Sequence, residues 1–276
     1  MTPPLPNLGL GILSWRGYDS LRATLKGYRD SGMLDLLGET LVFLPQMEQQ
    51  GIDLATEFDV PHTGTSDNLG ILGGFKAMAE AMKSDYVILA ENDFQLVDES
   101  KSPLPELARA LDHLKSGKSH VWRFRHLQQP GQTFHIEKIL KYWPAENASL
   151  MTKIVAIFRR LFRPKKAHKL KGMTVYIYQK PEEKFPDVIK RLPTGDLLVR
   201  SDVLNWANNV FLIERKFFLE TLLPVAEAHI GGRLINGFPT IETELNRSQW
   251  WKDQKLWIGV SAPGLFTHDR LNDRGY

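Results

Sequence analysis

The sequence predicts an α/β fold in which helices flank a mixed, mostly parallel central sheet, and two observations lead to this prediction. Apolar runs typical of buried strands lie at residues 8–14, 40–45 and 86–90, and segments with helical spacing of apolar residues separate them. The run at 86–90 is continuously apolar, as strands buried on both faces are. Strands that alternate with helices in this way favour parallel pairing through helical crossovers.

Two helices connect these strands. The first follows an N-cap at Asp19 or Ser20 and repeats apolar residues at helical spacing until Ser31. The second begins between residues 68 and 72 and ends near Ser84. Its apolar face comprises Ile71, Phe75, Met78, Ala79 and Met82. Each helix therefore has one face that can pack on the sheet.

The second half of the chain is less regular. The patterns predict a helix at 105–114, strands at 119–124, 175–178 and 197–199, a strand and helix at 210–223 that Pro224 ends, a helix at 241–251, and a last strand at 256–260. Residues 128–170 are the least readable. Within and just beyond them, residues 151–171 combine many basic side chains with an apolar helical face.

The composition excludes several classes of protein. The 276 residues contain no cysteine, which removes disulfides, thiolate metal sites and cysteine nucleophiles. The formal net charge of +3 is small for this length and argues against a dedicated nucleic-acid binder. The sequence contains no run of the roughly 18 apolar residues that a membrane span needs, and its N-terminus lacks a basic signal-peptide region. We therefore expect a cytoplasmic protein with no nucleic-acid partner.

The tripeptide Glu91-Asn92-Asp93 comes directly after the apolar run at 86–90. This position is the carboxyl end of a predicted strand, and open α/β sheets bind ligands at that edge. Alternate side chains share a face, so Glu91 and Asp93 can face one cation, and their oxygen ligands suit Mn²⁺ or Mg²⁺. A solvated acidic turn would give the same tripeptide.

Three segments resemble the central part of GT-A glycosyltransferases, those of family 2 in particular. Residues 66–70 (SDNLG), which precede a helix, are similar to the family's N-x-G helix start. The strand from Ser84 into Glu91-Asn92-Asp93 looks like the strand that carries the family's DxD motif, and residues 12–16 look like its first strand and nucleotide-contacting loop. The resemblance covers residues 8–97. It departs at Glu91, where the family has aspartate.

The resemblance implies a metal-dependent transfer of a sugar from a nucleotide-diphospho-sugar to an acceptor hydroxyl. It also implies a single domain over residues 1–276, in which residues 1–125 form the nucleotide-sugar half and residues 126–276 the acceptor half. The nucleotide-sugar site would comprise Ser14, Trp15, Arg16, Gln46, Glu48, Asp67, Asn68, Glu91 and Asn92. Trp15 could equally belong to the core, and Asn68 could serve only to cap its helix.

The implied metal, Mn²⁺ or Mg²⁺, would bind Glu91, Asp93 and His268, because many members of the family carry a late histidine as a further ligand. A surface histidine near the chain end is the alternative. Asp269 and Arg270 follow His268 and could contact the diphosphate or orient the imidazole.

An inverting enzyme of this kind needs an acidic base for the acceptor hydroxyl, and the resemblance places this base late in the chain. Glu242 and Glu244 are the candidates, and because residues two apart on a helix do not share a face, at most one can serve. Glu242 is favoured since it lies nearer to the loop at 237–239, although either could be a solvated helical glutamate. The Q-x-x-R-W motif of processive members is missing, which favours a non-processive enzyme.

Trp206, Asn208 and Asn209 suit a carbohydrate acceptor, whose hydroxyls need amide partners and whose faces stack on aromatic rings. The pair of asparagines is also a turn signal. The basic insertion around 151–172 suits contact with the inner face of an anionic membrane, and a glycolipid acceptor would fit such contact as well as a glycan. A solvated insertion with a few buried apolar anchors would give the same pattern. The alternative to an enzyme is a non-catalytic carbohydrate- or partner-binding module on the same fold.

Overall fold

The structure, a computed structural model, describes residues 3–132 and 136–271 and centres on a nine-stranded sheet. The strand order is β3-β2-β1-β4-β9-β6-β10-β8-β7. These strands are β1 (Leu5–Leu13), β2 (Leu37–Leu44), β3 (His62–Gly64), β4 (Tyr86–Glu91), β6 (Val121–Arg123), β7 (Ile189–Arg191), β8 (Leu197–Arg200), β9 (Phe211–Glu214) and β10 (Trp257–Val260). A separate two-stranded sheet pairs β5 (Phe94–Leu96) with β11 (Phe266–His268).

Seven of the nine strands in the large sheet run in one direction. β1 is parallel to β2 and β4, β2 is parallel to β3, and β6 is parallel to β10. The two reversed strands are β9, antiparallel to β4 and β6, and β8, antiparallel to β10 and β7. The prediction of an α/β fold with a mixed, mostly parallel sheet is therefore confirmed.

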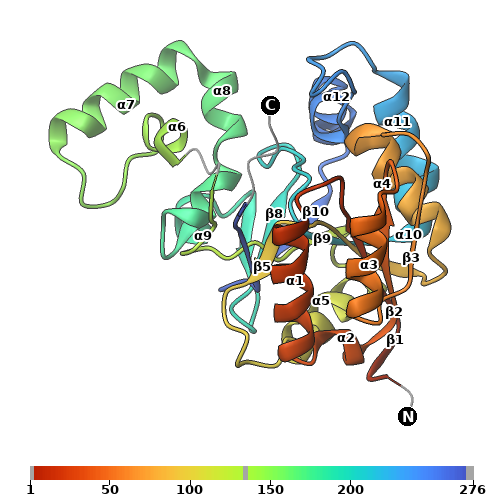
Figure 1. The fold of residues 1–276 in the computed structure, drawn as a ribbon. Helices are drawn as coiled ribbons and strands as arrows, with labels where there is room; N and C mark the ends of the chain where they lie inside the picture. The colour runs from red at the N-terminus through yellow and green to blue at the C-terminus, as the bar shows by residue number, and fades with distance from the viewer. Residues whose placement is uncertain (1–2, 133–135, 272–276) are drawn as a thin grey trace.

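Helices flank both faces of this sheet (Figure 1). One face carries α1 (Tyr18–Asp30), α3 (Gln49–Glu57) and α5 (Leu104–Lys115), and the other carries α4 (Gly70–Ala81), α11 (Leu223–Ala228) and α12 (Ile241–Arg247). Shorter helices are α2 (Met33–Leu36), α6 (Ile136–Leu140), α8 (Pro164–Lys169), α9 (Pro181–Lys184), α10 (Arg215–Phe217) and α13 (Trp250–Asp253), with a 3₁₀ helix η1 (Gly172–Tyr176) and a π-helix η2 (Phe218–Leu222). Helix α7 (Leu150–Phe162) projects from the body of the molecule together with α6 and α8 (Figure 1).

The two faces of β1 carry side chains of different size, and different helices pack on them. Leu8, Leu10 and Ile12 point to the face of α1, α3 and α5, because alternate side chains of a strand share a face. Gly9 and Gly11 alternate with them and lie under α4. A Cβ on Gly9 or Gly11 would come within 2.7 or 2.8 Å of a methionine side-chain atom of that helix or of the residue after it. The glycines therefore let α4 approach the sheet closely.

Strands β1, β2, β4, β6, β8, β9 and β10, and helices α1, α4 and α5, lie where the sequence patterns predicted them. Three expectations were wrong. Residues 175–178 belong to η1 and the turn after it, where the N–H groups of Ile177 and Tyr178 both donate to the carbonyl of Thr174. An apolar run this short does not distinguish a buried strand from a buried turn of helix.

Pro224 does not end its helix. It lies in the first turn of α11, directly after the π-helix η2, where its missing N–H costs no helical hydrogen bond. The predicted helix at 241–251 is divided into α12 and α13, with Gln249 between them at a φ of 61°. The strand at 256–260 is followed by β11, which is only three residues long and gives no periodic signal. Among the described residues, no helix has both the length and the apolar character to cross a bilayer.

Candidate active site

Two adjoining cavities lie at the carboxyl ends of β1 and β4. The first, which we call the Trp15 cavity, measures about 280 Å³ and is lined by Leu13, Trp15, Pro45, Asn68, Gly70, Ile71, Glu91, Ile235, Asn236, Phe238 and Arg270. The second, the Glu242 cavity, measures about 250 Å³ and is lined by Ile71, Glu91, Phe94, Asn208, Asn209, Ile235, Thr240, Glu242, Thr243, His268 and Arg270. Ile71, Glu91, Ile235 and Arg270 line both, so the cavities meet at these residues.

Asp93 is fully buried beside this meeting point. Its Oδ2 lies 3.1 Å from Nε of Arg270, and its Oδ1 lies 3.2 Å from Nε2 of His268. The pairing of β5 with β11 brings these residues together, because it places His268 opposite Phe94 and lets the N–H of Asp269 donate to the carbonyl of Asp93. The late histidine that the sequence singled out is therefore a neighbour of the acidic tripeptide.

Asn92 supports the loop after β1 and does not line either cavity. Its side chain is fully buried, and its amide donates to Oγ of Ser14 and to the carbonyls of Arg16 and Gly17, at 3.0, 2.9 and 3.1 Å. Arg16 and Gly17 have φ values of 55° and 66°, a conformation that L residues adopt rarely. Ser14 and Asn92, which the sequence analysis assigned to the nucleotide-sugar site, thus use their polar groups to hold the loop and line neither cavity.

Trp15 projects from this loop into the Trp15 cavity. Its indole Nε1 donates to Oε1 of Gln46 at 3.0 Å, and the guanidinium of Arg16 lies 5.1 Å from its ring centre. Trp15 is half-buried, so it is not a core residue. The alternative that placed it in the core is wrong, and one face of the cavity is an indole held by a side-chain amide.

Glu48 lies beside this loop, where it binds two other residues. Its carboxylate accepts a hydrogen bond from the hydroxyl of Tyr18 at 2.7 Å and lies 3.5 Å from Nε of Arg16. Burial, followed by the hydrogen bond to Glu48, raises the pKa of the Tyr18 hydroxyl well above its usual value. Tyr18 therefore stays neutral and fixes Glu48 as an acceptor.

Asn68 and Gly70 form the start of α4 and one wall of the Trp15 cavity. The Asn68 side chain accepts a hydrogen bond from the N–H of Gly70 at 2.9 Å, which holds the turn that leads into the helix, and Asn68 also lines the cavity. Gly70 has a φ of 64°, and a Cβ there would lie 2.3 Å from Phe238. Asp67 is exposed and accepts from Ser66 at 3.0 Å, outside the lining of either cavity.

A tight turn closes the cavities on the other side. Ile235 and Phe238 exchange two backbone hydrogen bonds of 2.8 and 3.0 Å, and Asn236 and Gly237 between them have φ values of 53° and 83°. This is the geometry that an Asn-Gly pair favours in a two-residue turn. Our sequence reasoning missed this turn, although the Asn-Gly dipeptide was a signal that could have revealed it.

Glu242 projects into its cavity from the first turn of α12. The residue as a whole is exposed, yet the protein atoms packed around its carboxyl group raise the pKa, because they disfavour the charged form. The buried guanidinium groups of Arg123 and Arg125 and the N–H of Asn208 act in the opposite direction. Glu242 is thus a carboxyl group with a raised pKa that lines a cavity of about 250 Å³.

Glu244 points away from the cavity, which corrects its place among the candidate bases. It is fully buried, accepts a hydrogen bond from the N–H of Gly232 at 3.0 Å, and lies 3.0 Å from Nη1 of Arg247. These contacts hold the segment before α12 against the helix. The two-residue spacing placed Glu242 and Glu244 on different faces of α12, as the sequence predicted.

Trp206 is also a structural residue, against expectation. It is 1% exposed, and its ring packs edge-on against Phe211 and Trp251 with ring centres 4.8 and 5.2 Å apart. Its Nε1 donates to Oδ1 of Asn208 at 3.0 Å, which fixes the orientation of that amide. Asn208 and Asn209 themselves line the Glu242 cavity.

Glu91, Asp93 and His268, the residues predicted to bind metal, meet only in part. Among residues 3–132 and 136–271 the side chains form no cluster of three carboxylate or imidazole groups arranged to hold a metal ion. Oδ2 of Asp93 accepts a hydrogen bond from Arg270, whereas Oδ1 lies 3.2 Å from Nε2 of His268. The donor types suit Mn²⁺, but the arrangement present is an Asp–His–Arg group with Arg270 as the fixed cation.

Comparison with known proteins gives only distant similarity. The chain matches no model of a known protein family and no curated protein sequence. Among solved structures, it is similar to the mannosyltransferase PcManGT from Pyrobaculum calidifontis in complex with GDP-Man and Mn²⁺, with 9% identity and a TM-score of 0.47 over 100% of this chain and 61% of that one. It is also similar to S. aureus TarS 1-349 in complex with UDP, with 8% identity and a TM-score of 0.46 over 94% and 59%.

A third similar structure is that of a mycobacterial protein, with 12% identity, a TM-score of 0.48, and coverage of 97% of this chain and 67% of that one. The matches to TarS and PcManGT span less than two thirds of those chains.

Proposed function

We propose that this chain is a GT-A glycosyltransferase that moves a sugar from a nucleotide-diphospho-sugar to an acceptor hydroxyl. The observation that carries the proposal is that two cavities with different chemistry meet at Glu91 and Arg270. One presents an indole and amides, which suit a nucleotide, and the other presents a carboxyl group and amides, which suit a carbohydrate hydroxyl. A donor bound in the first would have its transferable group at the entrance to the second.

In the proposed reaction, the base and ribose of the donor occupy the Trp15 cavity. Trp15 contacts the base while Gln46 holds the indole in place. Asn68 and the N-terminus of α4 face the donor from the opposite wall, where free N–H groups favour phosphate oxygens. Arg270 lies at the meeting point, so its positive charge is placed to stabilise the diphosphate as it leaves.

Glu242 is the proposed general base. It would remove the proton from the acceptor hydroxyl, and its raised pKa makes it a stronger base than an ordinary carboxylate. Asn208 and Asn209 would orient the acceptor. We propose an inverting enzyme in which the acceptor hydroxyl, next to Glu242, attacks from the side opposite the leaving group. The missing Q-x-x-R-W motif supports a non-processive enzyme. The division into a nucleotide half at 1–125 and an acceptor half at 126–276 is part of the same proposal.

A divalent cation, Mn²⁺ or Mg²⁺, belongs to the proposal as a cofactor. Glu91, Asp93 and His268 are the residues that would hold it, and it would supply Lewis-acid stabilisation of the diphosphate. Arg270 binds Oδ2 of Asp93 in the present arrangement, so Oδ1 is the oxygen of that carboxylate that would face the cation.

The first test is a thermal-shift screen of UDP, GDP, CMP and dTDP and their sugars, with and without Mn²⁺. We expect one nucleotide to raise the melting temperature and Trp15→Ala to abolish the rise. A rise that needs Mn²⁺ supports the metal assignment, and one that persists in chelator leaves Arg270 as the cation. If none of these compounds raises it, the proposal fails and the non-catalytic carbohydrate- or partner-binding module becomes the better account.

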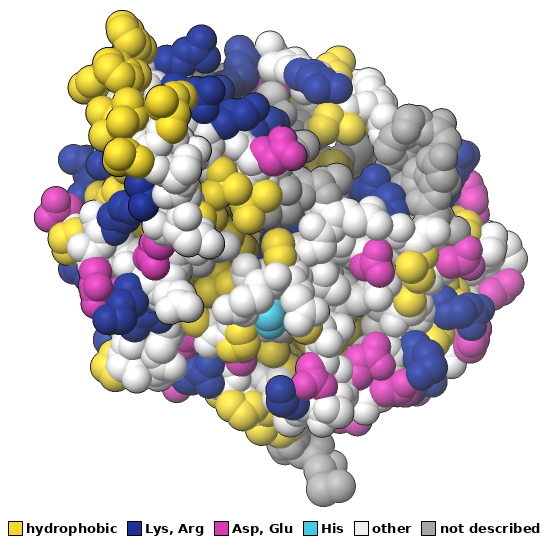
Figure 2. Space-filling view, turned by 90° about the vertical axis from the view of Figure 1, so that its left-hand side faces the viewer, with side chains coloured by type: hydrophobic (Ala, Val, Ile, Leu, Met, Phe, Trp, Pro, Cys, Tyr) yellow, Lys and Arg dark blue, Asp and Glu magenta, His cyan; other side chains and the backbone are white. Residues whose placement is uncertain are grey.

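We also propose that the basic insertion at 151–172 contacts an anionic membrane surface. In α7 the large apolar side chains are exposed, with Phe162 at 82%, Leu150 at 75% and Leu161 at 69%, and Ala156 is its buried residue. Figure 2 shows a group of apolar side chains at the upper left of the molecule, next to basic side chains. An amphipathic helix of this kind inserts its apolar face into the lipid headgroup region. The contact would suit a glycolipid acceptor.

A further inference from the structure

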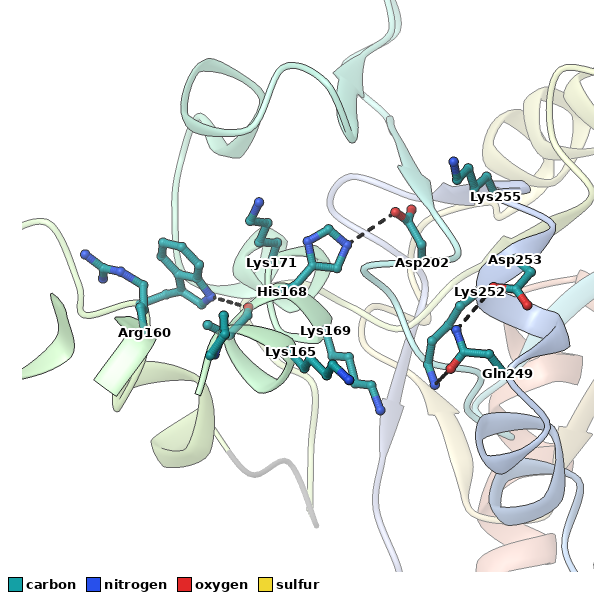
Figure 3. A pocket seen from close by; sticks show the side chains of 13 residues that line it. Arg160, Lys165, His168, Lys169, Lys171, Asp202, Gln249, Lys252, Asp253 and Lys255 are labelled. Atoms are coloured by element: carbon teal, nitrogen blue, oxygen red, sulfur yellow. Dashed lines mark hydrogen bonds and ion pairs between the residues drawn. The ribbon is translucent and has the colours of Figure 1, made fainter. Parts of the chain in front are cut away.

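A third cavity, of about 810 Å³, lies between α8 and α13 and shares no lining residue with the other two (Figure 3). Six basic side chains line it, namely Arg160, Lys165, Lys169, Lys171, Lys252 and Lys255. Asp202 and Asp253 are the carboxylates of the lining. The lining therefore carries an excess of four positive charges, which is more than the formal net charge of +3 of the whole chain. Positive charge is therefore concentrated at this cavity.

The two carboxylates do not neutralise the six basic groups. Asp202 forms an ion pair with Arg200 at 2.7 Å and lies 3.3 Å from Nε2 of His168, and neither residue is one of the six. Asp253 accepts a hydrogen bond from Gln249 at 3.2 Å. Within the described residues, none of the six basic side chains forms an ion pair with a carboxylate.

Three of the six come toward one another from two elements. Lys165 and Lys169 lie four residues apart on α8, so they share a face, and they extend toward the side of the cavity where Lys252 projects from α13 (Figure 3). Lys252 is 8% exposed, and its Nζ donates to the carbonyl of Asn246 at 3.2 Å. Burial first, and then the nearby ammonium of Lys169, lowers the pKa of Lys252 to about 8.

Like charges brought together in this way repel one another, and an anion between them would remove the repulsion. Lysine ammonium groups are common ligands of phosphate oxygens, which carry enough charge to meet several of them at once. We propose that this cavity binds a phosphate-bearing ligand through Lys165, Lys169 and Lys252. The phosphate belongs either to a soluble phosphate compound or to a lipid headgroup. This proposal does not depend on the proposed transferase activity.

The test uses inorganic pyrophosphate as the probe, in the presence of a chelator and at constant ionic strength, with the full chain. We expect pyrophosphate at ten times its Kd to raise the melting temperature of the parent by about 3 °C. Lys169→Gln and Lys252→Gln should each abolish most of this rise, whereas Lys118→Gln, which changes an exposed lysine on another part of the surface, should retain it.

The variants have a second readout that separates lost binding from lost folding. Without ligand, Lys169→Gln should melt at the same temperature as the parent or higher, because it removes a repulsive charge from beside Lys252. The proposal is overturned if pyrophosphate does not stabilise the parent, or if the two lysine variants are stabilised as much as the parent is. The second result would also assign the pyrophosphate to another site, such as the Trp15 cavity.

A vesicle experiment then identifies the source of the phosphate. Sedimentation of the parent and of Lys169→Gln is compared with phosphatidylcholine vesicles that contain phosphatidylglycerol. A severalfold loss of binding by Lys169→Gln supports a lipid headgroup in the cavity. Equal sedimentation of the two proteins, together with loss of the pyrophosphate effect, supports a soluble phosphate compound.

Discussion

Nε of Arg270 lies 3.1 Å from Oδ2 of Asp93, a residue 177 positions earlier in the chain. The same Asp93 carboxylate lies 3.2 Å from the imidazole of His268, and it is fully buried. A buried carboxylate without a charged partner destabilises the folded state, so Asp93 depends on its contact with Arg270. Arg270 also lines both cavities, so Asp93 fixes the position of the Arg270 guanidinium at the proposed transfer site.

The first prediction concerns this pair. Arg270→Gln should lower the rate of sugar transfer by about two to three orders of magnitude, since it removes the charge that meets the leaving diphosphate. Donor affinity should fall less. Steady-state kinetics with the donor identified by the thermal-shift screen would measure both. A variant with normal kcat and a raised KM would show that Arg270 only binds the donor.

The second prediction concerns the two glutamates of α12. Glu242→Gln should keep donor binding and lose transfer by at least two orders of magnitude, because the amide cannot accept the acceptor proton. Glu244→Gln, the matched control on the same helix, should keep kcat but lower the melting temperature, since Glu244 holds Gly232 and Arg247. If Glu242→Gln retains turnover, the base lies elsewhere.

The pH dependence of transfer follows from the same residue. Burial raises the pKa of Glu242, and a general base acts only when deprotonated, so kcat/KM should rise with pH through that raised pKa and then level off. A rise centred at the ordinary value for glutamate, or no rise at all, would contradict this assignment. The measurement needs initial rates of the parent enzyme over a range of acceptor concentrations, from well below KM to saturation, at each pH.

The third prediction concerns Asn92. Asn92→Ala should destabilise the protein by about 1–3 kcal/mol, because it removes a buried amide that donates to Oγ of Ser14 and to the carbonyls of Arg16 and Gly17. It should also weaken nucleotide binding, since the loop that carries Trp15 loses its support. Urea unfolding measures the first effect. The exposed Asn147→Ala should change stability by less than about 0.5 kcal/mol.

The fourth prediction concerns Glu106, which burial gives a pKa of about 7. Its folded pKa lies above its unfolded value, so between these two values the folded state holds more protons and stability falls as pH rises. Glu106→Gln should remove this fall and be more stable than the parent at pH 8, by an amount on the order of 2 kcal/mol. At a pH below the unfolded value the two proteins should be equally stable. Denaturant titrations at both pH values test this.

The fifth prediction concerns the proposed membrane contact of α7. Phe158→Asp with Leu161→Asp should abolish sedimentation with vesicles that contain phosphatidylglycerol, because both side chains are exposed and would lose their apolar character. Neutralising Arg159, Arg160, Arg163, Lys165 and Lys166 should weaken it and remove its salt dependence. Thermal stability should change little in the apolar variant. A parent that does not bind vesicles would end the membrane proposal.

The sequence determined the elements whose signal is local. The apolar runs located β1, β2 and β4. The position of Glu91-Asn92-Asp93 directly after the third run placed the acidic tripeptide at the carboxyl end of β4. The split between Glu242 and Glu244 also followed from spacing alone, because the helical period places them on different faces. For such features the residues that decide the structure lie within one or two turns of one another.

Only the tertiary structure decided which polar side chains line the cavities. Asn92 and Ser14 are turned inward to hold a loop, and Trp206 packs against Phe211 and Trp251, although each looked like a binding residue in sequence. The neighbours that impose these roles come from other elements, so no local pattern contains them. The contact between Asp93 and Arg270 depends on the pairing of β5 with β11, two strands of three residues each, and strands this short leave no periodicity in the sequence.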